Sequence, residues 1–231
     1  MPRQTRQRSD GRVPLSRERV LLAAVVLADE GGIEALSMRR LAQELGVKAM
    51  SLYNHVANKD DVLDGIVDSA WGEIVVPSSE ADWKNQIREI AISAHETLLR
   101  HPWASSLGAR QKPGPARLRY GESLLGCLRD AGFSKNLTYH AYHIIESYVL
   151  GYTIQVLSYR AVDTEQFQDI AARFVRGDFS AEFPHFTEHA LQHMETDHDD
   201  VNAYELGLDL LLDGLEKLRD TAAGGQGRLG R

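Results

Sequence analysis

Helical periodicity of the apolar residues is the feature that most constrains the fold of this 231-residue chain. Beyond residue 80, apolar positions recur every three or four residues in six segments, near 81–101, 116–131, 137–160, 163–176, 184–195 and 201–219. Glycine and proline separate these segments, at Pro102, Lys112–Pro115, Gly132, Gly177 and Pro184. No stretch shows convincing strand alternation of apolar and polar residues. The pattern predicts an all-α fold.

Four shorter helices are predicted ahead of a break at Pro77-Ser78-Ser79, with expected ranges of about 17–30, 38–45, 49–55 and 59–74. Side chains suited to N-capping precede three of them, namely Ser16, Ser37 and Asn58. Gly31-Gly32 and Gly46 stand where a left-handed residue would end a helix.

Residues 36–55 combine two short helices with a tight turn at Gly46, which is typical of a helix-turn-helix. Val47 and Leu52 are expected to point inward. The side chains left exposed on the second helix are Lys48, Ala49, Met50, Ser51, Tyr53, Asn54 and His55. A major groove admits one such helix, and the first helix braces it. A hairpin that merely packs is the alternative, but it does not need Ser51, Tyr53, His55 and Lys59 all on the exposed side.

The charge distribution separates a basic head from an acidic body. Residues 1–60 carry 10 Lys/Arg against 7 Asp/Glu, and the remainder carries 16 against 26, which together give the net charge of −7. Such asymmetry indicates nucleic-acid contact by one part only. Four arginines in residues 1–12 suit phosphate or minor-groove contact, or equally a solvated tail. A single cysteine, Cys127, and the lack of a secretory or membrane-spanning stretch favour a cytoplasmic protein.

A histidine repeat near the C-terminus is the one candidate metal site. His185, His189 and His193 recur every four residues, so on a helix they share one face and suit zinc or nickel. The segment 189–193 lacks the glutamate that follows the first histidine in zinc proteases, which argues against a hydrolase. A solvated polar helix is the main alternative, and the expectation is no metal, no cofactor and no enzymatic activity.

Residues 16–75 resemble the tetracycline-repressor (TetR) family. The likeness lies in Gly32–Ala42, Leu45-Gly46-Val47, Met50–Val56 and Asn58-Lys59. Looser motifs resemble the C-terminal part of the tetracycline-repressor branch, at Asp82-Trp83, Leu98–Trp103, Ala131–Phe133 and Tyr148–Gly151. The resemblance implies an N-terminal three-helix helix-turn-helix domain joined by a long helix to a helical ligand-binding and dimerisation domain. The expected ranges are a flexible arm 1–14, a DNA-binding domain 15–75, a body 76–221 and a disordered tail 222–231.

The resemblance also implies roles in DNA binding. Arg39, Lys48, Ala49 and Met50 would face base edges, whereas Ser51, Tyr53, His55 and Lys59 would face phosphates, with Asn54 beside them. Arginine can pair with guanine through two hydrogen bonds, and lysine or hydroxyl groups suit phosphate oxygens. Ala49 and Met50 can only touch a thymine methyl or exclude other bases. The expected partner is therefore double-stranded, palindromic operator DNA.

Two apolar stripes with spacings of three and four predict a homodimer held by a four-helix bundle. They consist of Ile145, Val149, Tyr152, Val156 and Tyr159, and of Tyr204, Leu208, Leu211, Leu215 and Leu218, widened by Leu212. Periodicity alone equally allows both stripes to face their own core. The resemblance favours the dimer.

Family members hold an effector among the helices between the DNA-binding domain and the bundle. The candidates here are Ile90, Ala94, His95, Leu107, Tyr142, His143 and Glu146. A magnesium-ligating histidine of the family is replaced by Ser106, and a drug-binding asparagine and phenylalanine by Ile90 and Ala94, so tetracycline–magnesium is not the expected effector. The predicted function is a repressor released by a small molecule. An activator, an effector-independent DNA-binding protein and a helical metalloenzyme are the alternatives.

Overall fold

The computed structural model describes residues 14–77, 82–108, 111–161, 179–194 and 202–226. Within these ranges every regular element is a helix. The helices are α1 (Arg17–Ala35), α2 (Met38–Glu44), α3 (Ala49–Leu52), α4 (Lys59–Trp71), α5 (Trp83–Arg100), α6 (Pro102–Gly108), α7 (Pro115–Asp130), α8 (Lys135–Ala161), α10 (Phe179–Glu182), α11 (Pro184–Met194) and α12 (Ala203–Gln226). The predicted all-α fold is confirmed.

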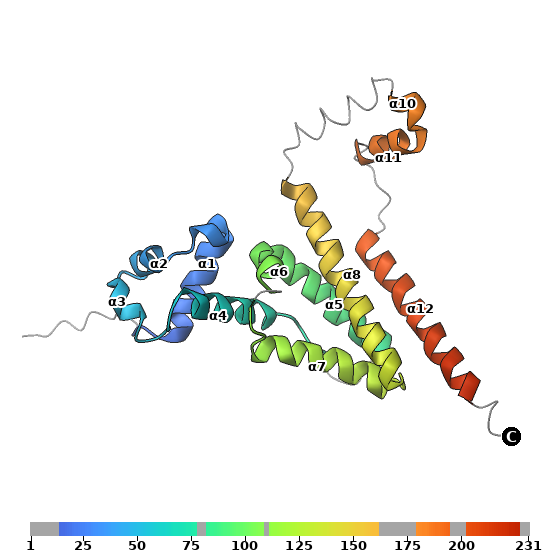
Figure 1. The fold of residues 1–231 in the computed structure, drawn as a ribbon, viewed down its shortest axis with the longest axis horizontal. Coiled ribbons are helices and arrows are strands. Elements are labelled where there is room, and N and C mark those ends of the chain that lie inside the picture. The colour runs from blue at the N-terminus through green and yellow to red at the C-terminus, as the bar shows by residue number, and fades with distance from the viewer. Residues whose placement is uncertain (1–13, 78–81, 109–110, 162–178, 195–201, 227–231) are drawn as a thin grey trace, which may run out of the picture.

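Helices α1, α2 and α3 form the N-terminal part, and α4 leads from them to the remaining helices (Figure 1). The predicted caps are present, because the Ser16, Ser37 and Asn58 side chains accept from the backbone N–H groups of Arg19, Arg40 and Asp61. The core of this part is aliphatic and closed, with Val20, Ala24, Leu41 and Leu52 at 4% exposure or less. Two of these three helices are short, and α4 completes the core by packing against α1.

Helix α4 is apolar on two sides. It packs against α1 and also against α5, α6 and α7. Ile66, Val67, Ala70 and Trp71 are all buried, and Ile74 continues the buried surface beyond the helix. One helix therefore belongs to both cores, so its position couples the N-terminal part to the body.

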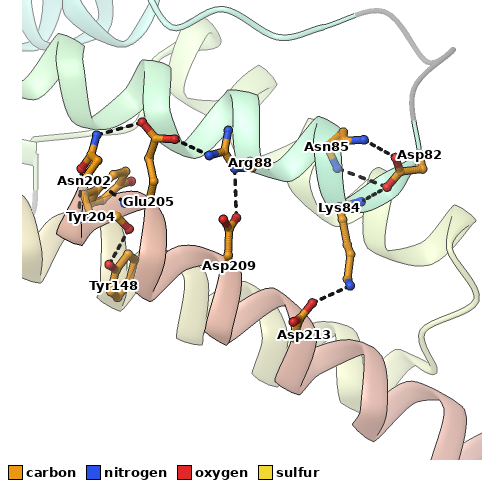
Figure 2. A network of polar contacts seen from close by, with 10 residues as sticks. All are labelled: Asp82, Lys84, Asn85, Arg88, Tyr148, Asn202, Tyr204, Glu205, Asp209 and Asp213. Carbon is orange, nitrogen blue, oxygen red and sulfur yellow. Dashed lines mark hydrogen bonds and ion pairs between the residues drawn. The ribbon is translucent and has the colours of Figure 1, made fainter. Parts of the chain in front are cut away.

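The body is built on α5, α7, α8 and α12, in which α8 packs against the other three helices and α5 packs against α7 and α12. Tyr204 of α12 is buried and donates to the Ala91 carbonyl of α5 at 2.8 Å. Figure 2 shows the polar rim of this contact, in which Arg88 of α5 pairs with Glu205 and Asp209, and Lys84 pairs with Asp213. Partly exposed ion pairs of this kind add little stability each, so the buried apolar face holds α12 in place.

Several predicted boundaries are wrong by a few residues. Gly32 breaks the helical geometry of α1 at φ 69°, but the helix resumes to Ala35 instead of stopping at Gly31-Gly32. The third helix ends at Leu52 and not at 55, and the fourth at Trp71 and not at 74. Pro102 begins α6 as well as ending α5, because a first-turn residue has no use for its N–H.

The C-terminal helix differs most from the prediction. Helix α12 continues to Gln226, past the expected end at 219–221 and into the tail expected to be disordered. Alanines and polar residues at 220–223 sustain the helix, and the glycines at 224 and 225 do not end it. The predicted helix at 163–176 lies outside the described residues, as do the arm 1–13 and residues 227–231.

Candidate nucleic-acid interface and effector site

The turn between α2 and α3 has the geometry that the glycine predicts. Gly46 lies at φ 64°, in the left-handed region. The N–H of Gly46 donates to the Gln43 carbonyl at 3.1 Å, and that of Val47 donates to the Ala42 carbonyl at 2.9 Å. These bonds satisfy carbonyls at the end of α2 and start α3 at a fixed angle.

Helix α3 is buried on one side and exposed to solvent on the other. Leu52 and Val56 lie at 0% and 2% exposure in the N-terminal core. The opposite side carries Met50 at 76% and Tyr53 at 45% exposure. Lys48, Ala49 and Asn54 are exposed as well, while Ser51 is half-buried. The structure therefore presents one side of a short helix to solvent, and a major groove is wide enough to admit such a helix.

The segment from His55 to Lys59 is braced against α1. Both Nη atoms of Arg17 donate to the Asp61 carboxylate, at 2.6 and 2.8 Å, and the Ala57 N–H donates to the same group at 2.8 Å. These bonds, the one from Arg17 first, lower the pKa of Asp61. His55 is half-buried here and Lys59 exposed. The sequence analysis placed Asp61 only in a helix first turn, because no local pattern pairs residues 44 positions apart.

All nine predicted DNA-contact residues lie on this side of the N-terminal part or on its margins. Arg39, on α2, is exposed, as are Lys48, Ala49, Met50, Tyr53, Asn54 and Lys59. The structure thus brings them together on α2, α3 and the start of α4. Their contact with DNA stays a prediction.

A polar cluster around the buried His101 joins the N-terminal part to the body. His101, at 7% exposure, lies between Asp29 of α1 and Glu73, with Nδ1 2.8 Å and Nε2 3.2 Å from their carboxylate oxygens. Trp103 donates to the same Asp29 oxygen at 2.7 Å. Burial opposes ionisation of Glu73, but hydrogen bonds from Arg100 and His101 hold its pKa below the usual value. The sequence analysis missed this cluster, whose members come from three separate segments.

The predicted effector residues divide between two places. Tyr142 lines a groove of about 490 Å³ between α7 and α8, with Gln111, Pro113, Arg117, Leu118, Gly121, Glu122 and Leu125. One turn further along α8, Glu146 accepts from the buried Tyr120 hydroxyl at 2.6 Å, and burial raises the pKa of Glu146. His143 is exposed, with its ring edge-on to Tyr139.

The second place lies about 16 Å further along α8, given the 1.5 Å rise per residue of a helix. His95 lies 2.8 Å from the Thr153 hydroxyl and stacks on Tyr204 with ring centroids 4.1 Å apart. Burial lowers the pKa of His95. Ile90 and Ala94 are at 2% and 0% exposure in the core, and Leu107 packs against it. The seven candidates therefore do not form one site.

The predicted dimer seam needs correction. Six of its eleven residues are at 2% exposure or less inside the protomer, namely Ile145, Val149, Tyr204, Leu208, Leu212 and Leu215. They face their own core, as periodicity alone had allowed, so a partner cannot contact them. Leu218 is exposed at 55%, while Tyr152, Val156 and Leu211 are half-buried.

The structure describes only part of the histidine repeat. His185 and His189 are exposed on α11, and the side chain of His193 and the whole of His198 lie outside the described residues. Among the residues that are described, no three His, Cys, Asp or Glu side chains are grouped as a metal site would require. Likewise, none of the described helices is both long enough and apolar enough to cross a bilayer.

Family models match both parts of the chain. Residues 20–66 match the bacterial regulatory proteins of the tetR family, and residues 76–219 match the tetracyclin repressor-like C-terminal domain. The chain belongs to the TetR family. This confirms the resemblance, and with it the prediction of a DNA-binding transcription regulator with an N-terminal helix-turn-helix and a helical C-terminal domain.

Two TetR-family relatives illustrate the closeness. An HTH-type transcriptional regulator of Saccharopolyspora erythraea is 38% identical over 139 residues, which is 59% of each chain. The HTH-type transcriptional repressor DrrR1 of Streptomyces coeruleorubidus is 34% identical over 140 residues, 59% of this chain and 52% of the repressor. The match thus spans little more than half the length of these curated relatives.

Solved structures match over a longer range. Apo ActR from Streptomyces coelicolor superposes with a TM-score of 0.74 at 27% identity, covering 91% of this chain and 99% of ActR. ActR in complex with actinorhodin gives the same TM-score and identity, with 90% and 99% covered. The arrangement of helices described above is therefore that of a TetR-family regulator.

Proposed function

We propose that this protein is a repressor that binds palindromic operator DNA as a homodimer and leaves it when a small molecule binds the helical body. The observation that carries the proposal is the surface of α3, where Met50 and Tyr53 are exposed while Leu52 holds the helix from within. A helix of four residues is not stable by itself, so the rest of the fold holds α3 in place. With the part of the chain that the structure describes, the exposed side of α3 makes no packing contact that would explain its residues.

Contacts to DNA divide into two kinds. Arg39, Lys48, Ala49 and Met50 face base edges and set the sequence preference. Ser51, Tyr53, Asn54, His55 and Lys59 lie along the margin and contact phosphates, which positions the helix without selecting sequence. The Arg17–Asp61 brace supports the second group because it fixes the loop that precedes Lys59.

The dimer forms through exposed surfaces of α8 and α12 that share only Leu218 with the predicted seam. Ile144 and Ile154 are 42% and 49% exposed on α8, and Leu206, Leu210 and Leu218 are 51–66% exposed on α12. Gly151 and Gly214 lie on the same exposed sides, and a Cβ added to either would meet nothing within 4 Å. Exposed leucines and isoleucines beside glycines allow the helices of a second copy to approach closely.

The groove beside Tyr142 is the site that we assign to the effector. It combines apolar walls from Pro113, Leu118 and Leu125 with the polar ends of Gln111 and Arg117, a mixture typical of small-molecule sites. The actinorhodin complex of the similar ActR supports a ligand response in this chain. The protein then acts by binding alone, with no catalytic role and no cofactor.

Release follows from a population shift. The effector binds better to the conformation in which the two α3 helices are wrongly spaced for successive major grooves, about 34–36 Å apart. Helix α4 is the lever, because its buried residues belong to both the N-terminal core and the body.

Selection from a randomised duplex library with the full-length protein tests this function. The expected result is enrichment of one two-fold symmetric sequence, bound at moderate salt, with an affinity that falls steeply as salt increases. Lys135→Ala, at the exposed start of α8 and outside the surfaces assigned to DNA, effector and dimer, serves as a control that keeps the same affinity. Recovery of no preferred duplex would contradict the proposal.

A further inference from the structure

The first turn of α7 is capped by a residue of another helix. Pro115, the first residue, has no N–H to satisfy. The next two N–H groups, of Ala116 and Arg117, both donate to Oδ1 of Asp68 on α4, at 2.9 and 3.1 Å. The N–H of Leu118 then makes the first bond within the helix, to the Gly114 carbonyl at 3.0 Å. Asp68 thus supplies the acceptor that the residue before a helix normally supplies.

Gly114 leaves room for this arrangement. It occupies the N-cap position at φ −84° and ψ 179°, a conformation open to any residue, and it contributes no side-chain cap. A Cβ at Gly114 would collide with the Asp68 carboxylate. Glycine is therefore needed here because it lets the Asp68 carboxylate approach the backbone, and not because the backbone angles require it. Nearby, a Cβ on Gly72 would come within 3.6 Å of the Ala116 Cβ, which shows how closely α4 and α7 approach.

The cap lies between the two functional sites. Lys59 begins α4 at the DNA-facing end, and Asp68 follows more than two turns later. On the other side, the groove assigned to the effector is lined by Pro113, which precedes the helix, and by Arg117, which belongs to the capped turn. Arg117 also lies over the Trp71 ring, 5.2 Å from its centroid. A molecule in the groove therefore touches the same turn that Asp68 holds.

We infer that Asp68 is a positioning residue for DNA recognition, which fixes α4 against α7 and so sets the place of the α3 surface relative to the body. The inference rests on the proposed function and names the contact through which the groove acts on α4. With the bond broken, α4 samples more orientations, and a smaller fraction of molecules has both α3 helices correctly spaced. Affinity for the operator then falls in proportion to that fraction.

A cap that merely stabilises α7 can be separated from one that positions α4. Asp68→Ala removes both functions. In that background the collision at Gly114 is relieved, so Asp68→Ala with Gly114→Asp restores a cap from within α7 while α4 stays unlinked. Asp68→Asn keeps an acceptor oxygen and serves as the conservative variant. Asp64→Ala makes the same change of charge one turn earlier on α4 and serves as the control.

The test measures the thermal midpoint and the affinity for the selected operator, by fluorescence anisotropy, of each full-length variant. Asp68→Ala should lower both. The double variant should recover the wild-type midpoint but bind at least about 5-fold more weakly than wild type, while Asp68→Asn and Asp64→Ala stay within about twofold. A double variant that binds as tightly as wild type, or more tightly, would overturn the inference. Wild-type protein that binds no duplex would instead contradict the proposed function itself.

Discussion

The N-terminal part and the body are both helical, but the sequence predicted the exposed surface of the first much better than that of the second. In the N-terminal part, most of the residues proposed to contact DNA are exposed, and the burial of Leu52 fixes which side of α3 faces outward. In the body, apolar stripes on α8 and α12 proved to face the protomer's own core at Ile145 and Leu208. A large apolar side chain held exposed on a short helix, such as Met50, indicates a partner surface, whereas an apolar stripe in the sequence indicates only that something covers it.

The largest expected effect comes from comparing a buried leucine and an exposed leucine of α12. Leu208→Asp places a carboxylate in a fully buried site and should destabilise the protomer by about 3–5 kcal/mol. Leu210→Asp, at a site 66% exposed, should leave the fold intact and yield monomers. Thermal unfolding together with light scattering distinguishes the two. Folded monomers from Leu208→Asp, or a stable dimer of Leu210→Asp, would restore the seam first predicted.

Phosphate and base contacts should separate within the N-terminal part. Tyr53→Ala and Lys59→Ala should each weaken binding to every duplex by about tenfold, since each contact contributes on the order of 1 kcal/mol. Lys48→Ala and Arg39→Ala should instead change which sequence is preferred, by about 1–3 kcal/mol at one position. Titration against the selected operator and its single-base variants measures both. A uniform loss for Lys48→Ala would move that residue to the phosphate group.

The Arg17–Asp61 brace should contribute little to stability at neutral pH but should make stability depend on pH in acid. The Arg17 side chain is 46% exposed, so Arg17→Ala should destabilise the fold by less than about 1 kcal/mol. Because Asp61 has a lowered pKa, its contribution is present above its usual pKa and is lost as the pH falls through the folded value. Arg17→Ala should therefore flatten the loss of stability under acid conditions. An unchanged acid profile would show that Ala57 alone lowers this pKa.

The smallest expected effect concerns His95 in the body. Burial lowers the pKa of its imidazole, so the fold favours the neutral form. Its contribution is complete above the usual pKa of about 6.5 and declines as the pH falls below it. His95→Gln should weaken the pH dependence of the unfolding midpoint in that range, and His140→Gln, at an exposed position of α8, should not. Equal effects of the two would place the dependence elsewhere.

Much of the fold could be predicted because its determinants are local. Ser16, Ser37 and Asn58 cap helices as expected, and Gly46 turns the chain between α2 and α3. These signals act within four residues, so a sequence displays them directly. The exposed surface of α3 followed from the same local pattern.

What could not be predicted depends on residues distant in sequence. Asp68 caps a helix that begins 47 positions later, and His101 joins Asp29 to Glu73 across three segments. The split of the effector candidates between Tyr142 and His95 likewise arises from how α5 and α7 pack on α8. Spacing along one helix carries no information on which neighbour covers each side.

Photo-crosslinking from α3 tests the central claim most directly. A benzophenone amino acid replaces Met50, which is 76% exposed, and in a separate protein replaces Leu118, which is 60% exposed in the body. With the selected operator, irradiation should crosslink position 50 to bases within each half-site and position 118 to no DNA. Crosslinks from position 118 but none from position 50 would contradict the placement of α3 in the groove.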